Sequence, residues 1–494
     1  MPTDAAPTMP FDLRNNVVLA AAFLIIGLTG LRLLSLWLGE TQLSTDEAQY
    51  WLWGQNFSLG AYSKPPMIGW IIAASTAVFG DSTWAVRMPA PLFHLVAAFS
   101  ILALGLRLAT PWVAALAATI YLTLPAVTLG SFLMTTDTPM LAAIALALWV
   151  QHILAGRKSG AQSNAALAVT LGAILAFGLM CKYAMLYAIG GMILAAVFSS
   201  AWRIRWQDTA TVTIVTMLLI LPNLVWVAGN NFVTVQHMAD TSGFTGPMLH
   251  PLVALRFVGE QFGVFGPIIF LAWLVALAQV KALSKPFQGL LAASGIILAG
   301  VIVQALLGKA LANWAVGFAV GASIIAAMKL AKHPVLIGLS FAIGGGLALA
   351  LPVLTVLGSE LRQNDRLVLG RYLGQDQLVA EAVSMARKTG AMHVASNHRD
   401  ILSALSWQGR NSGLTVEALP YDGAPRNYWE MSRSLSASRD DLVLIVTVAA
   451  PELSCPAEAG SIEAQRKPAG PGFLEGHEVY MTTVPAACIQ GVRE

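Results

Sequence analysis

The sequence predicts a polytopic α-helical membrane protein that carries a small α/β domain at its C-terminal end. Of the 494 residues, 56% are hydrophobic and only 11% are charged, whereas a soluble domain has roughly 25% charged residues. Apolar runs of membrane-spanning length recur up to residue 356, and beyond that point charged residues, Gly and Pro return. The net charge of +3, without a long Lys/Arg run, argues against nucleic-acid binding.

The apolar runs predict about 11 membrane-spanning helices, because about 20 apolar residues in a helix cross the hydrocarbon core. The first run is longer than the apolar part of a signal peptide, so we interpret it as an uncleaved span. The stretch 165–200 is too long for one span, and we expect a turn at Cys181-Lys182-Tyr183. The short run 66–80 is expected to lie along the membrane interface or dip into it. The predicted spans are 17–38, 86–106, 112–130, 138–155, 165–181, 184–200, 209–228, 261–280, 288–307, 313–328 and 335–356.

The distribution of positive charge predicts a cytoplasmic N-terminus, because cytoplasmic loops are enriched in Lys and Arg. One side of the predicted topology carries most of these residues, often in pairs, and the other side carries single ones. An odd number of spans then places the C-terminal end on the outer, periplasmic side of a bacterial inner membrane. The cytoplasmic set is Arg14, Arg107, Arg157, Lys158, Arg203, Arg205, Lys281, Lys285, Lys329 and Lys332, and the outer set is Lys64, Arg87, Lys182, Arg256 and Lys309.

The composition divides the chain into two predicted domains. Residues 1–356 form the transmembrane domain, with outer loops at 39–85 and 229–260, and residues 357–494 form a soluble periplasmic domain. We see no internal repeat.

Alternating helix and strand patterns predict an α/β fold for the C-terminal domain. DQLVAEAVSMARK at 376–388 reads as an amphipathic helix that ends at Gly390, and 398–408 reads as a second helix. MHVAS, DLVLIVTV and HEVYMTTV read as strands. Cys455 and Cys488 both fall in this domain, and a disulfide between them is a hypothesis that fits an oxidising compartment.

The first predicted outer loop contains STDEAQYWLWGQNFSLGAYSKPPMIGW at 44–70. Asp46 and Glu47 follow the first span closely, and Lys64 comes near the end of the loop. Ser44 and Glu47 also fit a capping box for a helix that starts near residue 45, and Lys64 could snorkel towards the interface. The residue types alone leave both the catalytic and the structural interpretation open.

Further polar residues lie on the same predicted side. Asp137, in MTTDTPM at 134–140, either caps the span that begins near Pro139 or takes part in chemistry. Lys182 is expected in the outer turn between two spans. Arg32 lies in the outer half of the first span, where it either snorkels or has a functional role.

Two later segments contribute candidate contacts. His237 and His250 lie in the loop 229–260, and their spacing does not match a metal site. Lys309 and Asn313, in GKALANW, are four residues apart and would share one face of a helix. The sequence has no P-loop, no GxGxxG followed by a helix and no Ser/His/Asp nucleophile motif, so nucleotide-sugar chemistry lacks support.

As an ordered set, these segments resemble the GT-C glycosyltransferases of the protein-mannosyltransferase and aminoarabinose-transferase superfamily, glycosyltransferase family 39. The resemblance covers roughly residues 40–320. It rests on the acidic pair after the first span, the lysine-proline that follows, TTDTP, the lysine-tyrosine at 182–183 and GKALANW. The late stretch NHRDILSALSWQGR is similar to the soluble tail of bacterial members.

The resemblance implies an inverting transfer of a sugar from a polyprenyl-phosphate donor to an acceptor on the outer side: lipid A, the lipopolysaccharide core, another glycan or, less readily, a protein. Asp46 would be the central carboxylate, and it should meet Lys64 in one outward-facing cavity. The implied catalytic residues are Asp46, Glu47 and Asp137, the donor-phosphate contacts are Lys64, Lys182 and Lys309, and further substrate contacts are Tyr50, Tyr62, His237 and Asn313.

Two departures from the aminoarabinose transferase matter for specificity. Gln49 stands where that enzyme has an arginine, and Ser63 stands where it has a glutamate before its lysine. The particular donor and acceptor are therefore not carried over. No cofactor is expected; a divalent metal is not required, although Asp46, Glu47 and Asp137 could hold one. We expect a monomer, and the competing hypotheses are a transporter of a lipid-linked sugar or a structural membrane protein.

Overall fold

The computed structural model describes residues 11–156, 164–244, 246, 248–455 and 463–489. The chain forms two compact units. The first, called the membrane unit below, consists of Met1–Leu36, Leu59–Ile68 and Arg87–Pro352, and the second, the C-terminal unit, of Trp37–Ser58, Gly69–Val86 and Val353–Glu494. Arg157 and Lys158, two of the charges used for the topology, lie outside the described residues.

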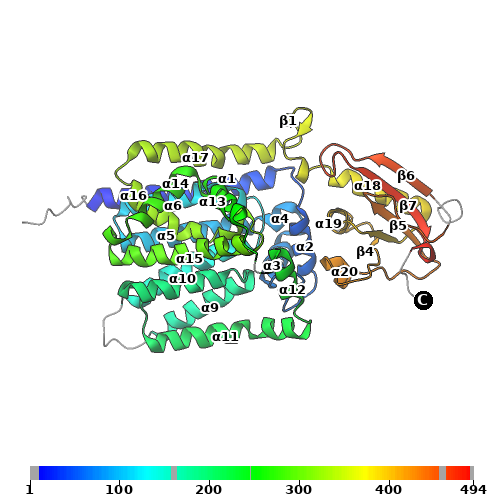
Figure 1. Cartoon of the computed structure of the whole chain (residues 1–494). Helices are drawn as coiled ribbons and strands as arrows, with labels where there is room; N and C mark the ends of the chain where they lie inside the picture. The colour runs from blue at the N-terminus through cyan, green and yellow to red at the C-terminus, as the bar shows by residue number, and fades with distance from the viewer. Residues whose placement is uncertain (1–10, 157–163, 245, 247, 456–462, 490–494) are drawn as a thin grey trace, which may run out of the picture. The chain divides into compact units, whose positions relative to one another are not determined.

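Helices make up the membrane unit, and Figure 1 shows many of them running alongside one another. Each predicted span falls on helical residues. Among the described residues, six helices are long and apolar enough to cross a membrane, or seven if one bent pair counts as a span. The helices are α1 (Phe11–Leu38), α5 (Pro89–Leu108), α6 (Pro111–Thr123), α7 (Pro125–Gly130), α8 (Asp137–Ala155), α9 (Ala165–Cys181), α10 (Met185–Phe198), α11 (Trp206–Gly229), α12 (Val233–Ser242), α13 (Pro251–Phe265), α14 (Pro267–Ala278), α15 (Lys285–Leu307), α16 (Phe318–Leu330) and α17 (Pro334–Val356).

The breaks between these helices confirm one prediction and correct two. α9 ends at Cys181 and α10 begins at Met185, so the expected turn is present. The run 112–130 forms two helices, because Pro125 starts α7. The run 261–280 is not one straight helix: α13 and α14 meet at an angle of 119°. Gly266, between them, has φ +79°, a backbone conformation that favours glycine.

Arg32, in the first span, is completely buried and does not snorkel. Its Nη2 donates a hydrogen bond of 2.6 Å to the carbonyl oxygen of Leu122. His94 and Tyr121 are also buried, and the Nδ1 of His94 lies 2.9 Å from the hydroxyl of Tyr121. The membrane unit thus contains a buried polar cluster around Arg32, and the snorkelling interpretation of Arg32 is wrong.

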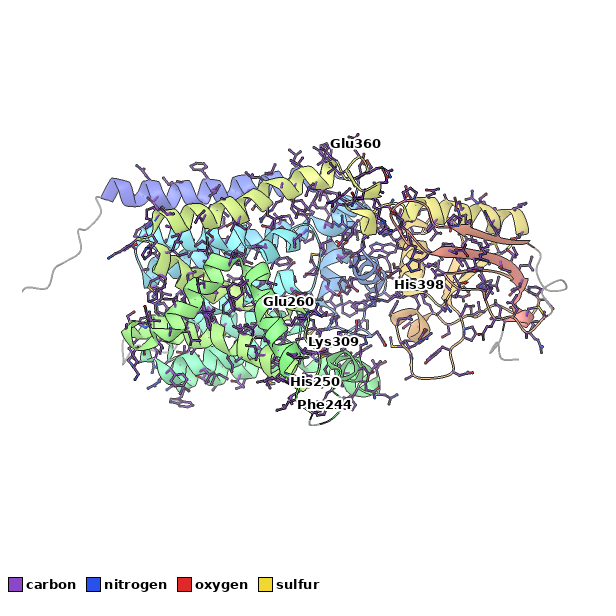
Figure 2. All side chains as sticks on the ribbon, turned by 45° about the horizontal axis from the view of Figure 1, so that its top comes forward. Phe244, His250, Glu260, Lys309, Glu360 and His398 are labelled. Atoms are coloured by element: carbon purple, nitrogen blue, oxygen red, sulfur yellow. A yellow bond between two sulfur atoms is a disulfide. The ribbon has the colours of Figure 1, made fainter. Side chains whose placement is uncertain are left out.

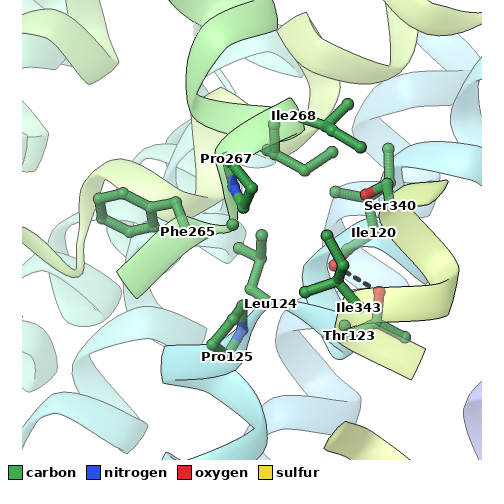
Figure 3. A pocket seen from close by; sticks show the side chains of 12 residues that line it. Ile120, Thr123, Leu124, Pro125, Phe265, Pro267, Ile268, Ser340 and Ile343 are labelled. Carbon is green, nitrogen blue, oxygen red and sulfur yellow. Dashed lines mark hydrogen bonds between the residues drawn. The ribbon is translucent and has the colours of Figure 1, made fainter. Parts of the chain in front are cut away.

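A small cavity lies where α6, α14 and α17 approach one another (Figure 3). Its volume is about 10 Å³, and apolar groups such as Phe265, Pro267 and Ile343 line it together with Thr123 and Ser340. That volume is about enough for one water molecule. The cavity is therefore too small to receive a sugar or a lipid.

The C-terminal unit contains a five-stranded sheet with strand order β4-β3-β5-β7-β6. β3 is parallel to both β4 and β5, whereas β7 is antiparallel to β5 and β6. α18 packs on β5 and β7, and α19 packs on β3 and β4. The elements are α2 (Thr45–Gly54), α3 (Met67–Phe79), α4 (Thr83–Arg87), β1 (Arg362–Gln363), β2 (Arg366–Leu367), α18 (Gln375–Thr389), β3 (His393–Ser396), α19 (Arg399–Gln408), β4 (Thr415–Ala418), α20 (Tyr428–Ser432), β5 (Leu442–Thr447), β6 (Glu463–Pro468) and β7 (Glu478–Pro485).

The three predicted strands and two predicted helices of this unit are confirmed by β3, β5, β7, α18 and α19. Gly390 ends α18 with φ +76°, as its position after the amphipathic pattern indicated. The sequence reading missed β4, β6 and the hairpin of β1 and β2, whose turn residues Asn364 and Asp365 both have positive φ. Cys455 and Cys488 are joined by a disulfide.

Candidate functional site

Asp46 lies in the first turn of α2. The Ser44 Oγ accepts the backbone N–H of Glu47 at 3.3 Å, and the Glu47 carboxylate accepts the backbone N–H of Ser44 at 2.9 Å. This capping box confirms the predicted start of the helix and gives the buried Glu47 a structural task. The side chain of Asp46 is 57% exposed. Of the acidic pair, Asp46 is thus the more exposed carboxylate, and catalytic roles for both Asp46 and Glu47 stay predictions.

Arg399, the first residue of α19, contacts Asp46 directly. Its Nη2 donates to Asp46 Oδ1 at 2.5 Å. Its Nε and Nη2 also donate to Oε1 of Gln49, at 3.1 and 3.0 Å. One guanidinium therefore bonds two side chains that lie one turn apart on α2. Gln49 and Asp46 precede Arg399 in the chain by 350 and 353 residues.

A pocket of about 300 Å³ lies beside this ion pair. Thr45 and Asp400, the chain neighbours of Asp46 and Arg399, form one of its walls, and the Thr45 hydroxyl donates to Asp400 Oδ1 at 2.6 Å. A volume of this size is at the lower end of ligand pockets. The complete lining is Ser44, Thr45, Arg371, Asp400, Gly472, Phe473, Leu474, Glu475 and His477.

The loop that closes this pocket has an unusual backbone. Leu474 has φ +59°, although it is not glycine, and Gly472 and Gly476 on either side also have positive φ. Left-handed conformations of this kind cost of order 1–3 kcal/mol for a non-glycine residue and cluster at ligand sites. The Glu475 carboxylate accepts the backbone N–H of Gly472 at 3.0 Å and holds the loop in this form.

In the membrane unit, Asp137 and Lys182 form an ion pair. Lys182 Nζ donates to Asp137 Oδ1 at 2.7 Å, and the side chains of Lys182 and Asp137 are only 17% and 15% exposed. Asp137 is the first residue of α8 and provides no side-chain cap for that helix. The structure therefore brings together a predicted catalytic residue and a predicted phosphate contact, and the capping interpretation of Asp137 is wrong.

The residues next to this pair border a large apolar cavity. The hydroxyl of Tyr183 donates to Asn223 Oδ1 at 2.6 Å, and Asn223 Nδ2 donates to the carbonyl of Leu59 at 2.8 Å. Burial raises the pKa of Tyr183, and its hydrogen bond to Asn223 opposes that rise only partly. The hydroxyl is therefore a hydrogen-bond donor at neutral pH.

The cavity has a volume of about 710 Å³ and lies between α9, α10 and α11. Tyr183 and Asn223 belong to its polar lining, and leucine, isoleucine, valine and methionine side chains make up most of the rest. Along α11 it extends from Thr209 to Leu224, which is about 22 Å at the rise of an α-helix. A long, apolar space with polar groups at Tyr183 and Asn223 suits a lipid chain with a polar head.

The structure brings two further predicted residues together. The rings of Tyr62 and His237 lie with their centroids 4.9 Å apart. The Thr234 hydroxyl donates to the carbonyl of Ala61 at 2.9 Å and attaches α12 to the same segment. Tyr50, in contrast, is buried in α2, with its ring 5.1 Å from that of Trp53.

Lys309 and Asn313 do not lie on one α-helix, contrary to the sequence expectation. α15 ends at Leu307, and Asn313 belongs to a separate 3₁₀ turn. The backbone N–H of Lys309 donates to the carbonyl of Ser242 at 2.7 Å, and an added Cβ at Gly308 would lie 2.4 Å from that same oxygen. Figure 2 shows the exposed Lys309 close to His250 at the end of the bundle. The close approach of Ser242, the last residue of α12, explains why the chain leaves the helical path after Leu307.

The three acidic residues of the predicted set each have an identified contact. Asp46 bonds Arg399, Glu47 caps α2, and Asp137 bonds Lys182. Within the described ranges, no group of three or more His, Cys, Asp or Glu side chains is arranged to hold a metal ion.

Sequence reasoning missed Arg399, Asp400 and Arg371 as site residues. Arg399 and Asp400 belong to the stretch NHRDILSALSWQGR, which the resemblance had singled out without assigning a role. A signal was thus present for these two residues, but their contacts with α2 depend on the tertiary fold. Arg371 stands in a segment that carries no recognisable motif.

The chain is similar in sequence to known glycosyltransferases. Residues 63–226 match the family of dolichyl-phosphate-mannose-protein mannosyltransferases. The chain is 32% identical over 472 residues to the lipid A galacturonosyltransferase RgtD of Rhizobium johnstonii. The aligned region covers 94% of this chain and 98% of that protein.

The fold is similar to that of two solved membrane transferases. ArnT from Cupriavidus metallidurans, solved with undecaprenyl phosphate bound, superposes with a TM-score of 0.65 at 11% identity, covering 93% of this chain and 97% of that one. The oligosaccharyltransferase of Archaeoglobus fulgidus gives a TM-score of 0.51 at 12% identity, covering 82% of this chain and 63% of that one.

The resemblance inferred from the ordered motifs is thus confirmed by the near full-length similarity to a transferase. The protein is an enzyme of the membrane rather than a transporter or a structural component. On the 32% identity over almost the whole of both chains, it belongs to the GT-C glycosyltransferases of the protein-mannosyltransferase and aminoarabinose-transferase superfamily.

Proposed function

We propose that the protein transfers a galacturonic acid residue from a polyprenyl-phosphate carrier to a lipid A acceptor. The observation that carries this proposal is the 32% identity to a lipid A galacturonosyltransferase over 94% of the chain. The lipopolysaccharide core and other glycans are the competing acceptors. The reaction takes place on the periplasmic side of the inner membrane, with the N-terminus in the cytoplasm and about 11 spans.

The donor lipid occupies the apolar cavity between α9, α10 and α11. Its length of about 22 Å and its volume of about 710 Å³ suit several isoprene units of a polyprenyl chain. Burial of such a chain against apolar side chains contributes roughly 25 cal/mol per Å² of surface removed from water. The Tyr183 hydroxyl and Asn223 amide, with Lys182 next in sequence, would receive the polar head.

The donor phosphate is held by Lys182, with Lys64 and Lys309 as further cations. Departure of the sugar increases the negative charge on this phosphate, and a fixed ammonium group stabilises that charge. Asp137 neutralises Lys182 in the absence of the donor, because an unpaired cation with 17% exposure would be costly. Tyr62, His237 and Asn313 are secondary candidates for contacts with the donor or the acceptor.

Asp46 removes the proton from the acceptor hydroxyl. The hydroxyl oxygen then attacks the anomeric carbon, the bond from that carbon to the phosphate oxygen breaks, and polyprenyl phosphate leaves with the electron pair. One displacement of this kind inverts the anomeric configuration. The pocket of about 300 Å³ formed by Thr45, Asp400, Arg371 and the loop 472–477 receives the sugar headgroup of the acceptor, because it offers both hydrogen-bond donors and acceptors.

Two features support a periplasmic C-terminal domain beginning near residue 357. The described part of this region is an α/β fold, and its disulfide between Cys455 and Cys488 suits an oxidising compartment. The monomeric state and the meeting of Asp46 with Lys64 in one cavity stay predictions.

Asp46→Asn tests the proposal most directly. The purified variant should fold normally, because Asp46 takes no part in the cap of α2, and should lose transfer of galacturonic acid from polyprenyl phosphate to lipid A. Removal of a general base lowers the rate by about 10²–10⁴-fold. Mass spectrometry of lipid A detects the product, and Glu47→Ala is the comparison variant, for which lost helix stability is expected because it removes the acceptor of the capping box. Full activity of Asp46→Asn would refute the assignment.

A further inference from the structure

The contacts of Arg399 differ from those of an ordinary surface ion pair. The Nη2–Oδ1 distance to Asp46 is 2.5 Å, and the same guanidinium donates twice to the oxygen of Gln49. Gln49 is 2% exposed, so its side chain has little freedom. Because the guanidinium is planar, two donors bound to one fixed oxygen determine the orientation of the whole group.

The stabilising effect of this contact on the fold is small. The side chains of Arg399 and Asp46 are 41% and 57% exposed, and exposed ion pairs contribute little to stability. A purely structural explanation therefore leaves unexplained why Gln49 orients the arginine. The geometrical consequence for Asp46 is larger than the energetic one.

The contact leaves one oxygen of Asp46 for chemistry. Oδ1 accepts the hydrogen bond from Arg399. Among the described residues, none donates a hydrogen bond to Oδ2. A carboxylate without this contact would rotate about its Cβ–Cγ bond, because terminal carboxylate torsions are broad. Fixing Oδ1 therefore also fixes the direction of Oδ2.

Arg399 is itself held by a rigid element. α19 is the crossover helix between the parallel strands β3 and β4. Its side chains Ile401, Leu402 and Leu405 are buried. Farther along α19, Trp407 packs edge-on against Trp51 of α2 with ring centroids 4.9 Å apart. The position of the guanidinium is therefore set by the sheet and by α2.

We infer that Arg399 is a positioning residue of the transferase, through which the C-terminal α/β fold orients the catalytic carboxylate of Asp46. The inference rests on the proposed role of Asp46. It assigns a function in catalysis to the segment after residue 357, whose helix α19 supplies the arginine. Gln49 has a subordinate part, since it orients the guanidinium and bears no charge that would compete with Asp46.

The test compares Arg399→Gln with Arg410→Gln in the full-length purified enzyme. Arg410 lies just after the C-terminal end of α19. It donates to the carbonyl of Asp81 at 2.9 Å, and its guanidinium lies over the ring of Trp407. It is a matched control because it makes an equivalent tertiary contact away from Asp46. Arg399→Gln should lower kcat about 100-fold, the cost of a misplacement near 1 Å, while KM for donor and acceptor changes less than about threefold. Arg410→Gln should keep the kcat of the wild type.

Two further measurements separate positioning from folding. Guanidine hydrochloride at millimolar concentration should restore part of the kcat of Arg399→Gln, since it replaces the missing group, and should not affect Arg410→Gln. Gln49→Ala should show a smaller loss of kcat than Arg399→Gln, because it removes only the anchor. A kcat of Arg399→Gln equal to that of the wild type or of Arg410→Gln, or a loss without guanidine rescue, overturns the inference. Inactive wild-type enzyme with lipid A and polyprenyl-phosphate galacturonic acid would instead overturn the proposed function.

Discussion

The ion pair of Asp137 and Lys182 allows a quantitative prediction about the proposed donor site. At a separation of 2.7 Å, two unit charges attract by about 6 kcal/mol at an effective dielectric constant of about 20. Desolvation and the ordering of both side chains remove most of this energy. We therefore expect a coupling energy of about 2 kcal/mol between the two residues.

The perturbation is a double-mutant cycle with Asp137→Asn, Lys182→Met and the combined variant. Each single change leaves one poorly solvated charge, and the combined change removes both charges. A coupling of about 2 kcal/mol corresponds to about 2–3 °C of melting temperature for a cooperative unit of this size, so the combined variant should melt that much higher than the sum of the single effects predicts. Tryptophan fluorescence during heating of the purified protein in detergent gives the melting temperatures.

The same cycle tests the role of Lys182 in donor binding. In Asp137→Asn the ammonium group lacks its partner, and a phosphate would supply the missing negative charge. Added undecaprenyl phosphate should therefore raise the melting temperature of Asp137→Asn by more than that of the wild type, and it should have little effect on Lys182→Met. A coupling near zero would refute the electrostatic reasoning, and equal lipid effects in all three proteins would refute the role of Lys182.

Three further predictions follow from local contacts. Gly60→Ala should lower the melting temperature and the yield of folded protein, because the added Cβ would lie 2.0 Å from the ring of Trp226 and overpacking costs about 1–3 kcal/mol; a melting temperature equal to that of the wild type would contradict this contact. Cys488→Ser opens a disulfide to Cys455 across 33 residues, which in the chain-entropy model costs the C-terminal fold about 4 kcal/mol; increased protease sensitivity of that region checks it, and unchanged sensitivity would show that the fold does not depend on the bond. Arg371→Gln should raise KM for lipid A about tenfold at constant KM for the donor, since it removes a cation from the pocket; an unchanged KM for lipid A would remove the pocket from the acceptor site.

Much of the site was accessible from the sequence as a set of residues but not as a set of contacts. Asp46, Asp137 and Lys182 were all expected to be functional, yet the pairing of Asp137 with Lys182 and of Asp46 with Arg399 was not expected. The spacing of residues does not reveal such pairs. Their separations of 45 and 353 residues are far larger than the range over which helical or strand periodicity carries information.

Local chemistry explains the features that the sequence determined by itself. The apolar runs, the capping box at Ser44 and the end of α18 at Gly390 each depend on residues within one or two helical turns. The turn between α9 and α10 follows from the length of one membrane crossing. In each case the determining interaction connects near neighbours in the chain.

Only the tertiary structure decided the bend at Gly266, the burial of Arg32, the strands β4 and β6, and the position of Arg399 against Asp46. β4 and β6 are short strands at the two edges of the sheet, and their partners lie elsewhere in the chain. Arg399 reaches Asp46 because α19 packs between the sheet and α2. Such features depend on which surfaces pack together, and that choice minimises the free energy of the whole fold rather than that of any one segment.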